Sequence, residues 1–248
     1  MIKKEKNLIY GRNPIFEALE SAKSIDKLFV QRGLKSDSIK EIVSLAAKAD
    51  TVIQKVPIEK LNRLTRNAAH QGVAGYLSLI RYYSLEDILS HVYDRGEVPL
   101  FLVCDGITDV RNFGAIARTA LGSGVHAVVI PSQGAASINA EALKTSAGAL
   151  NKIPVCKVND LENSVKYLQK NGLQILATSL QTDTMLYQAD LTIPTAIVVG
   201  AEDSGINASL LRMIDKWVKI PMAGDFDSFN VSVATAMSLY EVMRQRIV

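Results

Sequence analysis

The order of apolar and polar segments divides the chain into two parts. After residue 98, short runs are almost continuously apolar, which is typical of strands covered on both faces; they are residues 99–107, 124–130, 153–158, 173–179, 195–200 and 217–222. Between them, apolar residues recur at helical spacing in residues 113–124, 138–150, 160–172, 207–215 and 231–246. Because strands and helices alternate, we predict an α/β fold with a mostly parallel sheet and helices on both faces.

The front of the chain has a smaller pattern of its own. Helices are predicted over residues 13–21, 36–50 and 57–65, and strands over residues 25–32, 51–56 and 72–80. We therefore predict a small N-terminal α/β domain over residues 1–80. Residues 81–98 hold one or two amphipathic turns and a charged stretch that ends at Pro99, and we interpret them as a linker to a second domain over residues 99–248.

The composition is that of a folded globular protein. Of the 248 residues, 48% are hydrophobic and 21% are charged. No apolar run has the length of a signal-peptide core or a membrane span, so we expect a cytoplasmic protein with no membrane partner. Cys104 and Cys156 lie in predicted strands without the spacing of a metal site, so we expect two inert core thiols and no bound metal.

The net charge of +3 is unevenly distributed. Residues 1–80 carry 14 Lys and Arg against 8 Asp and Glu, whereas the remaining residues carry 14 against 17. A polyanion would therefore be attracted first to the front domain. The same excess is also compatible with an ordinary solvated surface.

The candidate chemistry lies in three turns that follow predicted strands. In open α/β sheets, ligands bind outside the carboxyl ends of the strands. Polar residues and glycines gather in these turns: Asp109, Asn112 and Arg118 in and after the first, Gly200, Glu202 and Gly205 in the second, and Ser228 and Asn230 in the third. The three turns together predict a ligand site at that edge of the sheet.

Each turn also has an ordinary structural explanation. Glycines permit tight turns, asparagine and serine cap helices, and an arginine pairs with surface carboxylates. The chain lacks the G-x-G-x-x-G fingerprint and the phosphate-binding loop. Their absence argues against a dinucleotide, and so against an oxidoreductase, and against a nucleoside triphosphate as the ligand. The residues by themselves therefore leave the ligand open.

Taken together, the three turns resemble the three motifs of the SpoU-type RNA ribose 2'-O-methyltransferases of the SPOUT superfamily. The matching segments are residues 109–120, residues 200–205 and residues 220–232, in the order and with the spacing of that family. The chain departs from the pattern at Val110, where the family usually has proline, and at Phe229, where it usually has leucine. Neither departure removes a reacting group, although Phe229 enlarges the apolar wall of the site.

The front of the chain is similar to the RNA-binding domain that many bacterial members carry, with GRNPIFEAL at residues 11–19 and HQG at residues 70–72. The resemblance is closest to the branch that methylates a guanosine of 23S ribosomal RNA. Two alternatives stay open: the same chemistry on transfer RNA, and a non-catalytic RNA-binding protein with this fold.

The resemblance implies a fold, a cofactor and a set of site residues. It implies a trefoil knot at the carboxyl end, a homodimer through the C-terminal domain, and S-adenosylmethionine as the methyl donor, with S-adenosylhomocysteine as product. The implied cofactor-binding residues are Leu180, Gly200, Ile220, Met222, Ser228, Phe229 and Val231. The implied catalytic residues are Asn112, Arg118, Glu202, Ser228 and Asn230.

Two of these expectations carry a physical argument. Arg118 is a poor base because its guanidinium keeps its proton, so we expect it to anchor a phosphate and to stabilise charge on the reacting oxygen. Ribosomal RNA is the expected partner of the basic front domain, and the residues expected to contact it are Arg12, Asn13, Arg63, Arg66 and His70.

Overall fold

The computed structural model describes residues 7–21, 24–49, 51–224 and 228–247, and the chain divides into two compact units, Met1–Arg81 and Tyr82–Val248. Each unit has its own sheet and its own buried core. The two are therefore described separately.

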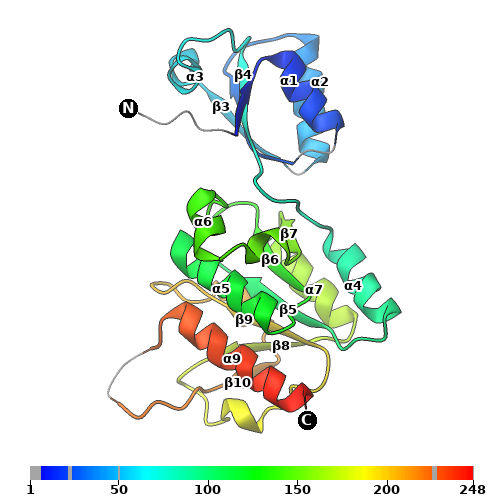
Figure 1. Cartoon of the computed structure of the whole chain (residues 1–248), viewed down its shortest axis with the longest axis vertical. Coiled ribbons are helices and arrows are strands. Elements are labelled where there is room, and N and C mark those ends of the chain that lie inside the picture. The colour runs from blue at the N-terminus through cyan, green and yellow to red at the C-terminus, as the bar shows by residue number, and fades with distance from the viewer. Residues whose placement is uncertain (1–6, 22–23, 50, 225–227, 248) are drawn as a thin grey trace. The chain divides into compact units, whose positions relative to one another are not determined.

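The first unit is built on a four-stranded sheet with the order β1-β4-β2-β3. Strands β2 and β3 are parallel, and β4 is antiparallel to β1 and β2. The strands are β1 (Leu8–Tyr10), β2 (Ile25–Gln31), β3 (Val52–Val56) and β4 (Val73–Leu77). Helices α1 (Arg12–Glu20) and α2 (Asp37–Lys48) cover one face, and α3 (Ile58–Thr65) covers the other (Figure 1).

Strand β2 shows why this small sheet is covered on both sides. Leu28 and Val30 pack under α1 and α2, whereas Phe29 between them packs with Leu61 of α3. Successive side chains of a strand point to opposite faces, so a run of apolar residues needs a helix on each side.

The second unit contains six strands in the order β10-β8-β9-β5-β6-β7. They are β5 (Leu100–Cys104), β6 (Ala127–Pro131), β7 (Val155–Val158), β8 (Gln174–Thr178), β9 (Thr195–Val199) and β10 (Lys216–Val218). Every pairing between neighbours is parallel, which confirms the predicted sheet. Strands β5 and β9 lie at the centre, and all of their residues are buried.

Helices cover both faces of this sheet, as predicted (Figure 1). On one face lie α4 (Leu85–Asp94), α7 (Leu161–Lys170) and α8 (Ala208–Leu211). On the other lie α5 (Val110–Gly122), α6 (Ala140–Thr145) and α9 (Val231–Arg246), with α5 packed between α6 and α9. Short 3-10 turns, η1 (Ala149–Asn151) and η2 (Leu186–Gln188), complete the connections.

The segment interpreted as a linker has structure of its own. Helix α4 occupies most of residues 81–98 and belongs to the second unit. Its Leu85 and Leu89 join the core of the large sheet, and Val92 is also buried. These three positions follow helical spacing, but charged neighbours surround them, so the apolar stripe is too narrow to stand out in the sequence.

Two further properties of the described residues bear on function. None of the helices in the described ranges is long and apolar enough to cross a membrane. Among the same residues, no group of three or more His, Cys, Asp or Glu side chains is placed to hold a metal ion.

The burial of the two cysteines gives a test of the core. Both thiols are free and buried, and burial raises the pKa of each to about 12. Since the thiolate is the reactive form, we expect neither Cys104 nor Cys156 to be alkylated by iodoacetamide in the native protein at pH 8, and both to react in denaturant. Mass spectrometry of the labelled chain checks this, and rapid labelling of either thiol in the native state would contradict the structure.

Candidate active site

The turns after β5, β9 and β10 meet at the carboxyl edge of the large sheet. A cavity of about 1010 Å³ opens there, lined by the ends of β8 and β9, by residues 200–202 and 204–206 of the turn after β9, and by residues 228–231 at the beginning of α9. The centre of the sheet supplies this arrangement, because β8, β9 and β5 are neighbours and run in the same direction. The structure therefore has a cavity at the edge of the sheet where the ligand site is predicted.

The side chain of Asn230 joins the three turns. Its Nδ2 donates to Oδ1 of Asn112 over 3.1 Å and also to Oε1 of Glu202. Its Oδ1 accepts from the backbone N–H of Ser232 over 2.9 Å, which caps α9. One amide thus uses both donors and its acceptor, so Asn230 is at once a helix cap and the link between segments more than 100 residues apart.

Asp109, rather than Asn112, caps the helix that carries the first motif. Its carboxylate accepts from the backbone N–H groups of Arg111 and Asn112, over 2.6 and 3.0 Å. The bond from Asn112, followed by the one from Arg111, holds the pKa of Asp109 below its usual range. Because Asp109 performs the capping, the Asn112 side chain is available to Asn230.

The second turn is closed tightly on itself. Ala201 and Gly205 exchange backbone hydrogen bonds of 3.1 and 2.9 Å, and Gly205 has a φ of 68°. A Cβ on Gly200 would overlap the backbone of Gly205 and Ile206. Two backbone segments approach so closely at residue 200 that only glycine fits. This close approach explains Gly200 more directly than the general preference for glycine in turns.

Asp105 also holds this turn, and the sequence reasoning did not single it out as a site residue. Its Oδ2 accepts from the backbone N–H of Asn207 over 2.6 Å. The residue directly follows β5, so its carboxylate reaches across to the end of the turn that follows the neighbouring β9. Its position at the end of a predicted strand could have marked Asp105 as a site candidate. Its hydrogen bond to Asn207 could not be predicted, because it depends on β5 and β9 being neighbours in the sheet.

The seven residues expected at the cofactor line two adjoining cavities. Gly200 and Val231 line the large one, Leu180, Ile220 and Met222 line a neighbour of about 240 Å³, and Ser228 and Phe229 line both. Thr178 and Ser179, at the end of β8, also line both cavities and were missed, because the family resemblance implied only the following Leu180 in this segment. The third motif also spans residues 225–227, which lie outside the described residues.

Arg118 does not lie with the other expected catalytic residues. It is exposed on α5, six residues after Asn112, which places it about 9 Å further along the axis and on another face of the helix. It does not line either cavity, and it makes no hydrogen bond or ion pair with any described residue. One copy of the chain therefore brings Asn112, Glu202, Ser228 and Asn230 together without Arg118.

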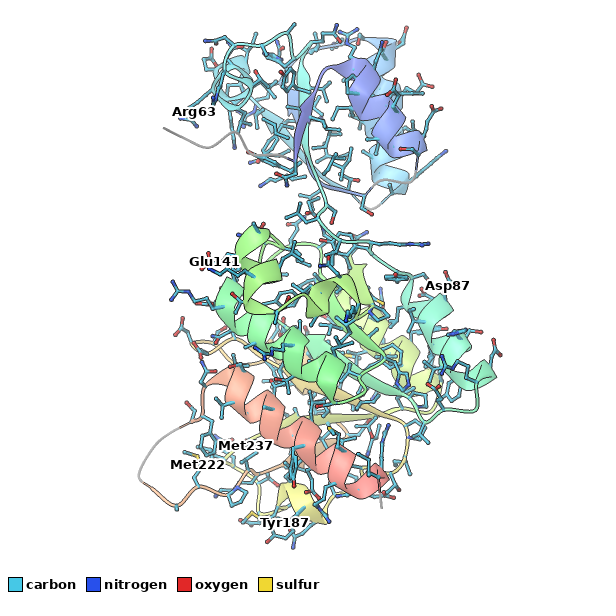
Figure 2. The ribbon with its side chains drawn as sticks, in the orientation of Figure 1. Arg63, Asp87, Glu141, Tyr187, Met222 and Met237 are labelled. Carbon is cyan, nitrogen blue, oxygen red and sulfur yellow. The ribbon has the colours of Figure 1, made fainter. Side chains whose placement is uncertain are left out.

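The expected RNA-contacting residues lie in three places in the first unit. Arg12 and Asn13 begin α1, whereas Arg63 is exposed on α3, on the opposite side of the small sheet (Figures 1 and 2). Arg66 is an exposed residue with a left-handed backbone at the end of α3.

His70 differs from the other four, because it is buried. Its Nδ1 accepts from the N–H of Gly72 over 3.0 Å, and its Nε2 lies 2.9 Å from Oδ1 of Asn62. Both ring nitrogens are therefore used inside the protein, and the structure gives His70 the role of shaping a turn.

Comparison with known proteins gives the class to which this fold and site belong. The model of the SpoU rRNA methylase family matches residues 99–240, and that of the RNA 2'-O ribose methyltransferase substrate-binding domain matches residues 8–83. The chain belongs to the SpoU/TrmH family of RNA methyltransferases.

Individual relatives agree with this assignment. A putative TrmH family tRNA/rRNA methyltransferase of Staphylococcus saprophyticus is 34% identical over 98% of this chain and 97% of its own. An uncharacterized tRNA/rRNA methyltransferase of Synechocystis is 35% identical over 97% of this chain, which spans 63% of that relative.

Solved structures share the fold. The SpoU methyltransferase AviRb of Streptomyces viridochromogenes, crystallised in complex with the cofactor AdoMet, superposes with a TM-score of 0.61 at 25% identity, covering 97% of this chain and 90% of its own. A TrmH/SpoU tRNA modifying enzyme of A. aeolicus is 32% identical with a TM-score of 0.55, covering 66% and 84%.

The dual role of Asn230 predicts a difference between two helix caps. In Asn230→Asp the carboxylate still caps α9, but it cannot donate to Asn112 and it faces the carboxylate of Glu202. Asn139 caps α6 only by accepting hydrogen bonds, so Asn139→Asp is the matched control. We expect urea unfolding to show a loss of about 1–3 kcal/mol for Asn230→Asp and under about 0.5 kcal/mol for Asn139→Asp. Equal losses of unfolding free energy in the two variants would show that the hydrogen bonds from Asn230 to Asn112 and Glu202 do not stabilise the fold.

Proposed function

We propose that this chain transfers a methyl group from S-adenosylmethionine to a ribose 2'-hydroxyl in RNA, with a guanosine of 23S ribosomal RNA as the first candidate target. The observation that carries the proposal is the meeting of all three motifs at the Asn230 side chain, beside a cavity that the second and third motifs line. The match of residues 8–83 to a substrate-binding domain of RNA 2'-O ribose methyltransferases supports the ribose target.

The residues present fit this cofactor. The two adjoining cavities together offer room for an adenosine and an amino-acid tail, since pockets for ligands of this size are commonly 300–1,000 Å³. The turn that begins at Gly200 brings backbone to the cavity surface where no side chain intervenes, which favours recognition by N–H and C=O groups. When bound, S-adenosylmethionine supplies an electrophilic methyl group on a sulfonium and leaves as S-adenosylhomocysteine.

The remaining catalytic work falls to the protein. A new O–CH₃ bond forms as the S–CH₃ bond breaks and the hydroxyl proton is released, so alignment of the two reactants is the main requirement. Glu202 lines the cavity, and Asn230 fixes one of its carboxylate oxygens, which leaves the other to orient a ribose hydroxyl. Asn112 fixes Asn230 in turn.

Arg118 completes the site only if a second copy of the chain supplies it. The residue is exposed, unpartnered among the described residues, and outside the cavities, so its guanidinium is available to a neighbouring subunit. Helix α9, which packs on α5, carries the exposed apolar residues Val233, Met237 and Tyr240 at helical spacing. Met237 is labelled on α9 in Figure 2. We propose that this stripe forms a twofold homodimer contact.

The proposal also covers the roles of the two domains and the topology of the second one. We propose that the front domain binds the RNA and that the C-terminal domain carries the methyl transfer. The basic excess in residues 1–80 supports the first assignment. We also expect the trefoil knot implied by the resemblance, formed by the segments of the second and third motifs.

Transfer of a labelled methyl group tests the proposed reaction. Purified protein, S-adenosylmethionine and unmodified RNA should give 2'-O-methyl nucleosides in 23S ribosomal RNA, located by mapping the modified position. Transfer RNA is assayed in parallel, because a relative is named a tRNA modifying enzyme. Methylation of transfer RNA alone would replace the target but keep the chemistry, and cofactor binding without transfer to any RNA would overturn the enzyme assignment.

Mixing two inactive variants tests the shared site. We expect Arg118→Ala to lower kcat at least about 100-fold, because a donor to developing charge is lost. Asn230→Ala should also be inactive, through the other half of the site. Mixed dimers would contain one intact site, so co-refolding at equal amounts should recover about a quarter of the wild-type activity, as half of the dimers are mixed.

The control for this experiment mixes Asn230→Ala with Glu202→Ala, which lie in the same half and should give no recovery. If both variants dimerise and the Arg118→Ala mixture stays inactive, the proposal that two subunits share the site is wrong.

A further inference from the structure

A second cavity, of about 660 Å³, lies in the first unit and is separate from the candidate active site. Its walls are the beginning of α1, the first half of α2 and the turn at Gln71, and α1 and α2 lie side by side on one face of the small sheet (Figure 1). The lining residues are Arg12, Asn13, Phe16, Ser38, Glu41, Ile42 and Gln71.

The turn at Gln71 is held in an unusual conformation. Gln71 has a left-handed backbone with a φ of 51°, and buried His70 fixes it by accepting the N–H of Gly72. Gln71 in turn accepts the backbone N–H of Arg12 at its Oε1 over 3.0 Å, and the Nε of Arg12 at its carbonyl over 3.3 Å. A non-glycine residue in this region costs free energy that the surrounding contacts must offset, and such residues gather at ligand sites.

These contacts leave the polar groups that face the cavity available. The Nε of Arg12 is used, but its two terminal nitrogens make no hydrogen bond with the described residues. The Glu41 carboxylate likewise makes no hydrogen bond or ion pair with them, and it is not paired with Arg12. A cation and a carboxylate thus share one cavity without neutralising each other.

Two of the seven lining residues are apolar. Phe16 is half-buried against the small core, and Ile42 is fully buried. A flat group with an apolar face can contact Phe16 while its edge reaches the polar side chains of the cavity. An unstacked base in RNA has this form, and bases of single-stranded RNA are recognised by stacking and through their Watson–Crick edge.

We propose that this cavity binds one unstacked guanine nucleotide of the RNA, as a recognition site distinct from the nucleotide that is methylated. The Watson–Crick edge of guanine offers two adjacent N–H donors, which match the two oxygens of the Glu41 carboxylate. Adenine offers one such donor group and uracil offers one N–H between two acceptors. The terminal nitrogens of Arg12 bind the neighbouring phosphate.

The proposal rests on the proposed function for the presence of an RNA substrate, and it adds a base that the front domain reads. None of the residues that meet at Asn230 lines this cavity, so no reaction is assigned to it. His70 acts here as a positioning residue for Gln71, which explains why it is buried in a domain expected to bind RNA.

Binding of short RNAs to the full chain tests the site. Four labelled hexaribonucleotides, all uridine except for A, C, G or U at one central position, are titrated by fluorescence anisotropy. We expect the guanine hexamer to bind about tenfold more tightly than the all-uridine one, the scale of one bidentate base contact. Glu41→Gln should abolish this preference, because an amide presents one donor where guanine needs an acceptor. It should not weaken all-uridine binding, because loss of a carboxylate lowers the repulsion of RNA phosphates.

One further variant separates recognition of the base from binding of the phosphate, and another serves as its control. Arg12→Gln should weaken binding of all four hexamers equally and reduce the dependence on salt by about one phosphate contact. Glu59→Gln is the matched control, since Glu59 is exposed on α3 and does not line the cavity, and its guanine preference should equal that of the wild type.

Circular dichroism confirms that each variant is folded before its binding is interpreted. A wild-type chain that binds no hexamer, or binds all four equally, would overturn the inference, as would a Glu41→Gln variant that keeps the preference. Methyl transfer to RNA by the wild type is measured alongside. Transfer without guanine preference rejects this site alone, whereas guanine preference without transfer to any RNA rejects the proposed function and keeps the site.

Discussion

The hydrogen bonds of the Asn230 amide are the constraint on which the large unit's site depends. Three turns from distant parts of the chain reach the same edge of the sheet, and the Asn230 side chain makes hydrogen bonds that connect all three. The amide donates to Asn112 and Glu202 and accepts from the start of α9. An aspartate, serine or threonine caps a helix equally well but lacks two donors on one atom, so asparagine is required by the combination of tasks.

The turn after β9 is part of the wall of the cavity beside this link. Gly200 is fixed by its contact with Gly205 and Ile206, and Asp105 holds the far end of the same turn through the N–H of Asn207. Backbone groups held in this way are already positioned before a ligand arrives, which lowers the ordering cost of binding. In this member of the SpoU/TrmH family, the second and third motifs thus line one cavity at the carboxyl ends of β8 and β9.

The two units differ in how they use charge. In the first unit, Arg12 and Glu41 line one cavity without pairing with each other, and buried His70 holds the turn that brings Gln71 to the same cavity. In the second, Arg118 is presented away from the cavity of its own copy. Under the proposed function, both arrangements keep cationic groups available for RNA phosphates or for a second subunit, where internal ion pairs would have consumed them.

The sequence by itself determined the six strands of the large sheet, the helices between most of them and the core positions of both cysteines. It also indicated the sheet edge where the cavity lies. These features could be predicted because the spacing of apolar residues and the apolar content of a segment are local properties. It predicted only one or two amphipathic turns where α4 lies, because the narrow apolar stripe of this helix is recognisable only against the sheet that it covers, and it gave no sign that His70, an expected RNA contact, is buried. Only the tertiary structure decided that Asn230 meets Asn112 and Glu202, that Asp105 reaches Asn207, and that Arg118 does not join them. These contacts depend on the strand order β10-β8-β9-β5-β6-β7, and the direction and neighbour of a strand are set by how the whole sheet buries its faces.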